Sequence, residues 1–284
     1  MAPICQMLDV AVSDSEISRD RQRRTPDILS AERLSFRYGQ DESAPFILKD
    51  VSFSVRDGEF VSILGPSGCG KSTLLYLLGG FLRRTSGDLR FRDMAIAGPS
   101  TARGIVFQDF ALFDWQTTIS NVEFGLKCKG MHRDERRATA MRHLSLVGLQ
   151  DAAGRYPRQL SGGMKQRVAI ARALAAEPDV LLMDEPFGAL DALSRDNLQD
   201  QIRRIWFETK KTIVFVTHSV EEAVFLSQRV IILKPNPGQI AEILAIDTAP
   251  EATRRDLEAD PILREKSRYL GHLVRSVDNR ASPS

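Results

Sequence analysis

The sequence predicts an α/β protein with a mixed sheet, accompanied by an antiparallel β subdomain and an α-helical subdomain. Residues 33–38 and 51–55 alternate apolar and polar side chains, the pattern of half-buried antiparallel strands. Short apolar runs follow, which is typical of buried parallel strands separated by helices. The expected buried strands are 60–64, 104–107, 180–183, 212–217 and 230–233, and the expected helices are 71–82, 132–147, 163–175 and 193–209.

Composition excludes several classes of protein. The chain has 284 residues, with 39 Lys and Arg against 37 Asp and Glu, and this balance gives no footprint of a dedicated nucleic-acid binder. A hydrophobic fraction of 43% and a charged fraction of 27% are those of a folded globular protein. No apolar run reaches the roughly 18 residues needed to cross a bilayer. Three widely spaced cysteines favour a reduced, cytosolic setting.

Three segments are expected along the chain. Residues 1–28 are polar, lack the pattern of a secretory signal, and are expected to be a flexible N-terminal extension. Residues 29–245 are expected to form the main domain, and 246–284 a helical tail. The pair Asp260–Pro261 is a typical helix start. The apolar stripe that follows it predicts packing on the main domain, and contact with a partner is the alternative.

The segment Gly-Pro-Ser-Gly-Cys-Gly-Lys-Ser at 65–72 fits G-x-x-x-x-G-K-[ST] and lies between a strand and a helix. Glycines let successive backbone N–H groups point at phosphate oxygens, and the helix N-terminus adds its dipole. Lys71 supplies a charge for the β- and γ-phosphates, and the Ser72 hydroxyl is suited to Mg²⁺. Cys69 is either an inert small residue, which we favour, or a reactive thiol activated by the helix N-terminus.

Two acidic residues follow the apolar run 180–183 directly. Buried carboxylates are unfavourable unless they are paired or bound to a metal. Beside a phosphate-binding loop, Asp184 is therefore expected to hold Mg²⁺, and Glu185 is placed to act as the general base on water. The alternative is an ordinary acidic loop at the end of a strand.

A second glycine-rich element, Leu-Ser-Gly-Gly-Met-Lys-Gln-Arg, occupies residues 160–167 at the start of another expected helix. Its hydroxyl and backbone N–H groups could bind an anion, although Ser-Gly-Gly is also a common helix cap. Taken alone, this signal is weak.

In combination, these elements resemble the ATP-binding subunits of ABC transporters across about residues 30–245. The resemblance rests on the loop at 65–73, the segment 160–167 and the acidic strand 180–186, in the family's order. Four further positions fit: Tyr38 in Phe-Arg-Tyr-Gly, Gln108 in Val-Phe-Gln-Asp, Asp191 in Gly-Ala-Leu-Asp, and His218 in Val-Thr-His-Ser. It implies a P-loop NTPase core, ATP and Mg²⁺ as cofactors, and a head-to-tail dimer with two ATP molecules between the subunits.

The resemblance also implies roles for single residues. Glu185, His218 and Gln108 would be catalytic. Tyr38 would stack on adenine, the alternative being an aromatic on a strand face in the core. The metal would be held by Ser72, Gln108 and Asp184, and the nucleotide by Tyr38, Gly65, Pro66, Ser67, Gly68, Cys69, Gly70, Lys71, Ser72 and Thr73 of one subunit with Ser161, Gly162, Gly163 and Asp191 of the other.

The partners follow from the same resemblance. The helical subdomain, at about 109–165, would dock against transmembrane permease subunits at the cytoplasmic face of the inner membrane, and an external solute-binding protein would act indirectly. Apolar residues at its start would serve this contact or else pack inside the subdomain; they are Phe110, Leu112, Phe113 and Trp115.

Further motifs resemble the branch of importers for nitrate, sulfonate and taurine. They are Trp115-x-Thr117, Asn121-Val122-x-Phe124-Gly125-Leu126 and Lys234-Pro235-x-Pro237-Gly238. Asp114 departs from the branch, where Pro often precedes the tryptophan. The alternative function is a non-transport ABC ATPase that acts on nucleic acid or ribosomes. A long coiled coil, paired cysteines or a second cassette would favour that alternative, and the sequence has none of them.

Overall fold

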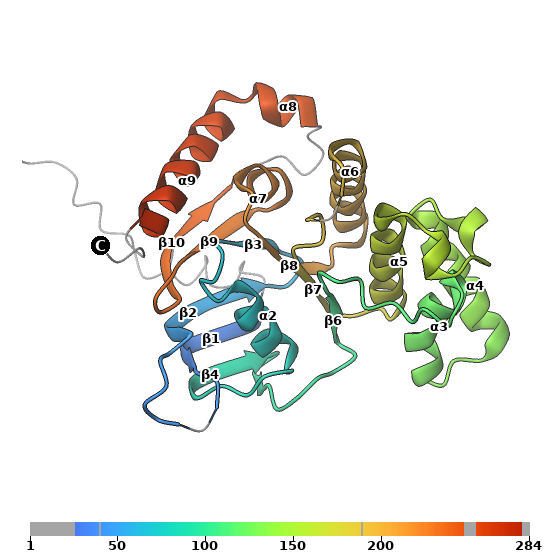
Figure 1. Cartoon of the computed structure of the whole chain (residues 1–284), viewed down its shortest axis with the longest axis horizontal. Helices are drawn as coiled ribbons and strands as arrows, with labels where there is room; N and C mark the ends of the chain where they lie inside the picture. The colour runs from blue at the N-terminus through green and yellow to red at the C-terminus, as the bar shows by residue number, and fades with distance from the viewer. Residues whose placement is uncertain (1–25, 40, 189, 247–253, 280–284) are drawn as a thin grey trace, which may run out of the picture.

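The chain folds around two β-sheets that share a hydrophobic core (Figure 1). The computed structural model describes residues 26–39, 41–188, 190–246 and 254–279. The four-stranded sheet is antiparallel, in the order β2-β1-β4-β5, with strands β1 (Asp27–Phe36), β2 (Leu48–Arg56), β4 (Ser86–Phe91) and β5 (Met94–Ala95). The six-stranded sheet has the order β10-β9-β3-β8-β7-β6, with strands β3 (Phe60–Leu64), β6 (Arg103–Val106), β7 (Val180–Asp184), β8 (Thr212–Thr217), β9 (Arg229–Lys234) and β10 (Gln239–Ala245).

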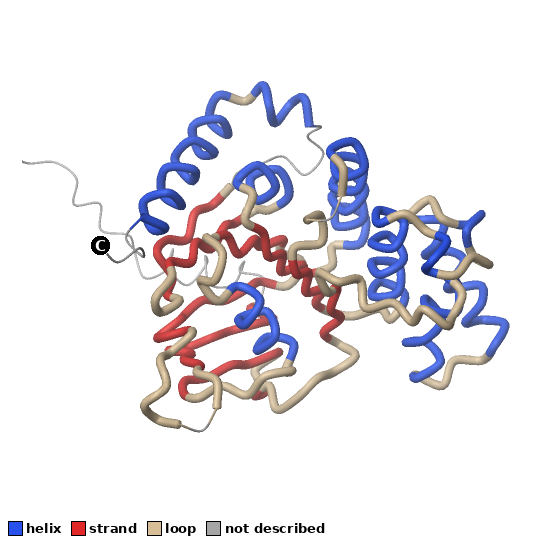
Figure 2. Tube along the Cα trace, viewed as in Figure 1, coloured by secondary structure: helices blue, strands red, loops and turns tan. Residues whose placement is uncertain are grey.

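The six-stranded sheet is mixed, because β10 runs antiparallel to β9 while the other described pairs are parallel. The predicted α/β class, with its antiparallel sheet and its helical part, is confirmed. Figure 2 shows helices on both sides of the strands and a separate group of helices beyond the β6 edge. The helices are α2 (Lys71–Gly79), α3 (Thr118–Cys128), α4 (Arg133–Leu146), α5 (Gly162–Ala175), α6 (Ala192–Thr209), α7 (Val220–Leu226), α8 (Arg254–Ala259) and α9 (Pro261–Asn279), with 3₁₀ turns η1 (Gln150–Ala152) and η2 (Pro157–Gln159).

The side chains of β7 point alternately to the two faces of this sheet, and their contacts show which helices cover each face. Leu182 belongs to the core that α2 forms with the four-stranded sheet, where Leu74 and Leu78 are fully buried. Leu181 and Met183 point to the opposite face and join the core beneath α5, α6 and α7. Because side chains alternate along a strand, one strand supports both layers. The helices α2 and α5 therefore lie on opposite faces of the same sheet.

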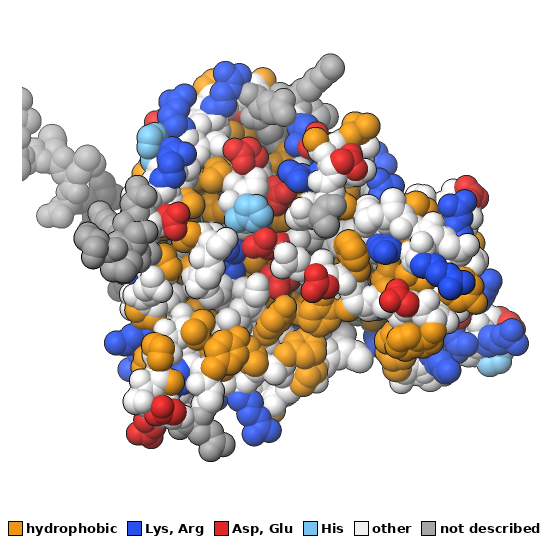
Figure 3. All heavy atoms as spheres, in the orientation of Figure 1, with side chains coloured by type: hydrophobic (Ala, Val, Ile, Leu, Met, Phe, Trp, Pro, Cys, Tyr) orange, Lys and Arg blue, Asp and Glu red, His pale blue; other side chains and the backbone are white. Residues whose placement is uncertain are grey.

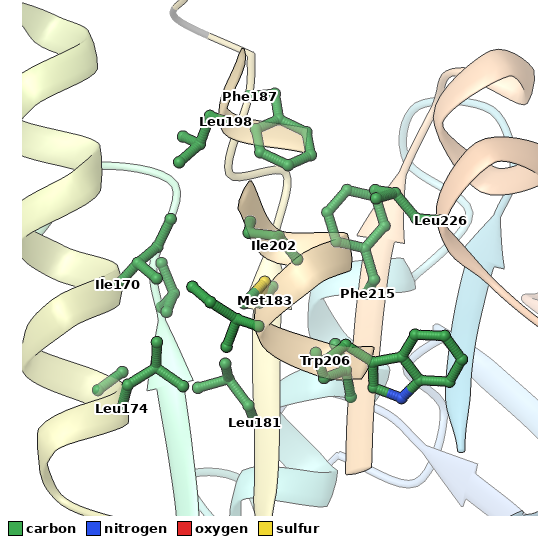
Figure 4. Packing of buried hydrophobic residues seen from close by; sticks show 14 of the residues in the cluster. Ile170, Leu174, Leu181, Met183, Phe187, Leu198, Ile202, Trp206, Phe215 and Leu226 are labelled. Carbon is green, nitrogen blue, oxygen red and sulfur yellow. The ribbon is translucent and has the colours of Figure 1, made fainter. Parts of the chain in front are cut away.

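The second core has α5 and α6 packed across β7 and β8 (Figure 4). Trp206 closes one end of it, with its ring 5.8 Å from that of Phe60 and its indole N–H donating to the Gly58 carbonyl oxygen at 3.0 Å. Burial of such aromatic and aliphatic side chains is the main stabilising contribution to the layer. The residues labelled in the figure are Ile170, Leu174, Leu181, Met183, Phe187, Leu198, Ile202, Trp206, Phe215 and Leu226.

Some element boundaries differ from the predicted ones. The first strand begins at Asp27, two residues before the expected domain start at residue 29, and that domain limit stays a prediction. Residues 1–25 of the expected extension lie outside the described residues. The helix expected over 71–82 ends at Gly79, because Gly80 adopts a left-handed conformation (φ +82°) that caps it. The region expected to be a helical subdomain contains α3 and α4; its limits at 109 and 165 stay a prediction.

The tail agrees with its prediction in part. Asp260 accepts a hydrogen bond from the Ile262 N–H at 2.8 Å at the start of α9. Leu263 and Leu270 are buried against the main domain, whereas Ile262 and Tyr269 of the expected stripe are exposed. Residues 247–253 and 280–284 of the tail lie outside the described part of the chain. No described helix is both long and apolar enough to cross a lipid bilayer.

Candidate active site

The loop between β3 and α2 curls around the side chain of Lys71. The ammonium group of Lys71 is buried and donates to the carbonyl oxygens of Gly65 and Pro66, both at 2.9 Å. No side chain caps the first turn of α2, and no acidic residue lies in that turn. The backbone N–H groups of this helix end and the lysine charge together form a site for an anion.

Glycines allow this loop to turn so tightly. Gly68 and Gly70 have positive φ angles of +77° and +97°, which L side chains rarely adopt. At Gly65 an added Cβ would lie 2.8 Å from the Cys69 Sγ and 2.6 Å from the backbone oxygen of Leu233. Burial raises the pKa of the Cys69 thiol, so the structure favours the inert residue over the reactive thiol. Ser67 and Gly68 form the exposed tip of the loop.

A hydroxyl and a carboxylate meet beside this loop. Ser72 Oγ donates to Asp184 Oδ1 at 2.9 Å, although 112 positions separate the two residues. Asp184 ends β7 and is only 1% exposed. Burial raises its pKa, while hydrogen bonds from Ser72 and Tyr76 lower it in part. Burial, the charge of Asp184 and the hydrogen bond to it raise the pKa of Tyr76 to about 12, so the phenol remains a donor at neutral pH.

Glu185 lies between a lysine and a histidine. Its Oε1 is 3.7 Å from the Lys71 ammonium, and its Oε2 is 2.9 Å from His218 Nδ1. In the tautomer that carries its proton on Nδ1, the histidine donates this hydrogen bond to the carboxylate oxygen. Glu185 has a positive φ of +41°, and its N–H donates to the Val216 carbonyl oxygen at 3.1 Å. Strain of this kind in a non-glycine residue persists only where the surrounding structure enforces it, as at functional sites.

Strand register explains why these groups converge. Leu64 pairs with Thr217, and Asp184 pairs with Val216, so β3, β8 and β7 end at one edge of the sheet. The residues that follow each strand therefore lie side by side. Open parallel sheets bind ligands at this edge, beyond the carboxyl ends of the strands.

Tyr38 and Gln108 flank this group. The Tyr38 ring is exposed, and its hydroxyl is 3.4 Å from Thr73 Oγ1, so the alternative of a buried aromatic on a strand face is wrong. Gln108 is exposed two residues after β6, the strand that pairs with β7. Among the hydrogen bonds of the described residues, none joins Gln108 to Glu185 or Asp184. Its expected metal and catalytic roles stay predictions.

The second glycine-rich element lies elsewhere. Ser161 caps α5 by accepting from the Met164 N–H at 3.3 Å, and Asp191 caps α6 by accepting from the Ser194 N–H at 2.9 Å. Ser161, Asp191 and Gly162 are exposed, and Gly163 is half-buried. Over the described residues, no hydrogen bond or ion pair connects these side chains to the loop around Lys71. Within one chain, the two expected anion-binding elements are thus separate.

Sequence analysis missed Tyr76, which hydrogen-bonds Asp184. A signal was present, because Tyr76 follows Ser72 by four residues and side chains at that spacing share one helix face. It also missed Glu222, a buried carboxylate close to His218, which sequence alone places on an ordinary helix.

The arrangement suits a phosphate ester with a divalent cation. Mg²⁺ usually takes one or two protein oxygens together with phosphate oxygens. Ser72 and Asp184 offer such a pair, and the described residues contain no group of three or more His, Cys, Asp or Glu side chains that could hold a metal alone. The carboxylate of Glu185 lies 3.7 Å from the Lys71 ammonium, beside this pair. A carboxylate in such a position is of the chemical type that can accept a proton from water.

The chain is similar in sequence to several known proteins. The family model described as ABC transporter matches residues 48–188. A putative ATP-binding protein of Brucella abortus (strain 2308) is 48% identical over 220 residues, covering 77% of this chain and 83% of its own. A taurine import ATP-binding protein of Yersinia pseudotuberculosis is 44% identical over 227 residues, covering 78% of this chain and 89% of its own.

A solved structure is similar as well. A dimeric ATP-binding cassette in a post-hydrolysis state, bound to ADP and Pi, superposes with a TM-score of 0.70 at 34% sequence identity. The match covers 78% of this chain and 100% of that one.

Proposed function

The chain belongs to the ABC transporter family and is an ATPase of that family, and from this premise we propose that it drives the import of a small solute through a membrane permease. The observation that carries the proposal is the meeting of Lys71, Glu185 and His218 beside the Ser72–Asp184 pair. The taurine import relative supports a small oxyanion such as taurine, sulfonate or nitrate as the solute.

Hydrolysis then proceeds by attack of water on the γ-phosphorus of ATP. Glu185 accepts the proton of that water, the bond from the γ-phosphorus to the bridging oxygen breaks, and ADP leaves with the electron pair. Lys71 and the N–H groups at the start of α2 bind the phosphates, and His218 stabilises charge on the γ-phosphate. Mg²⁺, held by Ser72 and Asp184, would neutralise phosphate charge. Tyr38 offers an exposed ring for the adenine base.

A head-to-tail dimer would complete the site. Ser161 and Gly163 begin a helix on the opposite face of the sheet from α2, and they are open to a second copy. In the proposed dimer they bind the γ-phosphate held by the partner's loop, and Asp191 joins the contact. The dimeric state of the similar solved cassette supports this arrangement.

The permease would contact the surface over α3, where hydrophobic side chains gather (Figure 3). Trp115 is 75% exposed, and Phe124 and Tyr156 are also exposed. They line a groove of about 370 Å³ together with Glu123 and Lys127. By contrast, Phe110 and Leu112 pack partly against the core, as the packing alternative predicts for them. Contact of the exposed Trp115 with a permease stays a proposal. Exposed apolar surface of this kind is typical of a protein contact. The chain would then lie peripherally at the cytoplasmic face of the membrane.

A first experiment tests the mechanism. The Glu185→Gln variant should bind ATP without hydrolysing it, and light scattering should show a 31.7 kDa chain becoming a dimer only when ATP is added. Fast hydrolysis by this variant, or no ATP-dependent dimer with or without the permease, would contradict the proposal.

A second experiment tests the partner and the solute. The chain should co-purify with a polytopic membrane permease, and one of taurine, sulfonates or nitrate should stimulate hydrolysis in the complex reconstituted with its binding protein. Co-purification with nucleic acid or ribosomes instead would support the non-transport alternative.

A further inference from the structure

A buried carboxylate, Glu222, supports the short loop that carries His218. This loop, residues 217–219, starts at the last residue of β8 and leads into α7. Thr217 Oγ1 donates to Glu222 Oε2 at 2.5 Å, and the Ser219 N–H donates to the same Thr217 Oγ1 at 3.0 Å. The Glu222 N–H donates in turn to Ser219 Oγ at 3.2 Å. Both neighbours of His218 are therefore fixed in one ring of hydrogen bonds that closes through Glu222.

The other oxygen of Glu222 leads toward the C-terminal tail. Gln199 of α6 donates from Nε2 to Glu222 Oε1 at 3.3 Å. The Oε1 of the same amide accepts from Arg254 Nη2 of α8 at 2.8 Å. An amide has one donating and one accepting end, so the arginine on its oxygen turns the nitrogen toward Glu222. Arg254 is itself held over the Phe225 ring at 4.1 Å and by an ion pair with Asp196 at 3.4 Å.

His218 needs such support because its own side chain is mostly exposed. Its side chain is 62% exposed, and the hydrogen bond that the structure gives it is the one to Glu185. Its position relative to Glu185 is consequently set by the backbone of residues 217–219. Glu222 is only 9% exposed, and a buried carboxylate without a catalytic contact requires a reason for its presence.

We infer that Glu222 is a positioning residue, which holds the 217–219 loop so that His218 meets Glu185 and the γ-phosphate, and that Arg254 of the tail fixes Glu222 through the amide of Gln199. The inference rests on the proposed mechanism, because the role of His218 comes from it. It makes the tail helix α8 a part of the framework of the site. Neither Glu222 nor Arg254 touches the nucleotide in this account.

A double-mutant cycle on the full-length chain tests the inference. Glu222→Ala should lower kcat about 10-fold, while KM for ATP stays within about 3-fold, since orientation rather than binding is lost. The more conservative Glu222→Gln retains an oxygen and an N–H group and should lose only about 3-fold. In the His218→Ala background, Glu222→Ala should change kcat by less than about 2-fold, because residues that act through one another are not additive. Single-turnover assays with labelled ATP keep slow variants measurable.

The matched control is Glu59→Gln, which removes another buried carboxylate, one that is ion-paired with Arg229 at the opposite end of the strands. It should leave kcat unchanged even if both variants lower the melting temperature. For the tail, Arg254→Ala should lower kcat about 3-fold and add nothing to Glu222→Ala. The exposed Arg268→Ala on α9 is its control and should have no effect.

The outcomes separate this inference from the proposed function. If the wild-type chain fails to hydrolyse ATP, the proposed function is wrong. The positioning role is wrong if the wild-type chain hydrolyses ATP and Glu222→Ala has the same kcat as the wild type. It is also wrong if Glu222→Ala lowers kcat further, by its full factor, in the His218→Ala background. A second measurement is independent of turnover: the ring resonances of His218, assigned with His218→Gln, should move in Glu222→Gln and not in Glu59→Gln. If the His218 resonances do not move in Glu222→Gln, the inference is wrong, whatever the measured rate of hydrolysis.

Discussion

The two expected phosphate-binding elements of this chain are built differently. Around Lys71, the loop, Ser72, Asp184, Glu185 and His218 are joined by hydrogen bonds and ion pairs within the chain. Around Ser161, the polar groups cap helices and otherwise face solvent. The first element is preorganised by its own fold, which is favourable for catalysis. The second is exposed and complete only when something else meets it.

The largest expected effect comes from breaking the first element. Lys71→Ala removes the charge and both hydrogen bonds that close the loop. We expect ATP hydrolysis to fall by about 10²–10⁴-fold, the range typical when a preorganised electrostatic contact is lost. Steady-state phosphate release measures it. Near-normal turnover by a folded variant would mean that the loop does not bind the nucleotide.

The next prediction concerns the need for a second copy. Ser161→Arg places a bulky cation at the exposed end of α5 and should lower hydrolysis about 10–100-fold by blocking the partner's phosphate. Mixing this variant with Lys71→Ala should restore activity. In a mixed dimer, the intact loop of the Ser161→Arg subunit faces the intact Ser161 of the Lys71→Ala subunit. Each variant alone serves as the control. If the mixture stays as inactive as its parts, the two elements do not meet between chains.

A smaller effect is expected on stability at the first element. Because burial raises the pKa of Asp184, the folded chain binds its proton more tightly than the unfolded chain does. The free energy of unfolding therefore falls as pH rises from the ordinary range of an aspartate through the raised pKa. Asp184→Asn should remove this dependence and raise the melting temperature at pH 7 by about 2–4 °C, while abolishing hydrolysis. Thermal melts from pH 4 to 8 test it, and a lower melting temperature for Asp184→Asn would contradict it.

The smallest effect concerns a cap in the second element. Asp191→Ala removes the acceptor for the Ser194 N–H at the start of α6 and should lower the free energy of unfolding by about 1 kcal/mol. Asp191→Ser, which preserves a cap, is the matched control and should lose little. Urea denaturation measures both. Equal losses in the two variants would show that the carboxylate contributes something other than capping.

Much of the first element was predictable from sequence because its chemistry is local. Glycines at fixed spacing, a lysine, and two acids after an apolar run identify Lys71, Asp184 and Glu185 before any contact is known. Caps are equally local, and the start of α9 at Asp260 was predicted for that reason. Boundaries were less predictable, as in α2, where one left-handed glycine ends a helix that the apolar pattern continues.

Partners distant in the chain were not predictable in the same way. Tyr76 reaches Asp184, and Glu222 reaches Gln199, only because strands and helices far apart in sequence pack together. The sequence by itself determined which residue types form the loop, the acidic strand end and the helix caps, since backbone conformation and capping depend on a few neighbours. Tertiary structure alone decided which of these groups touch and which stay exposed, because hydrogen-bond partners across the fold are chosen by strand order and by packing on the two faces of the sheet.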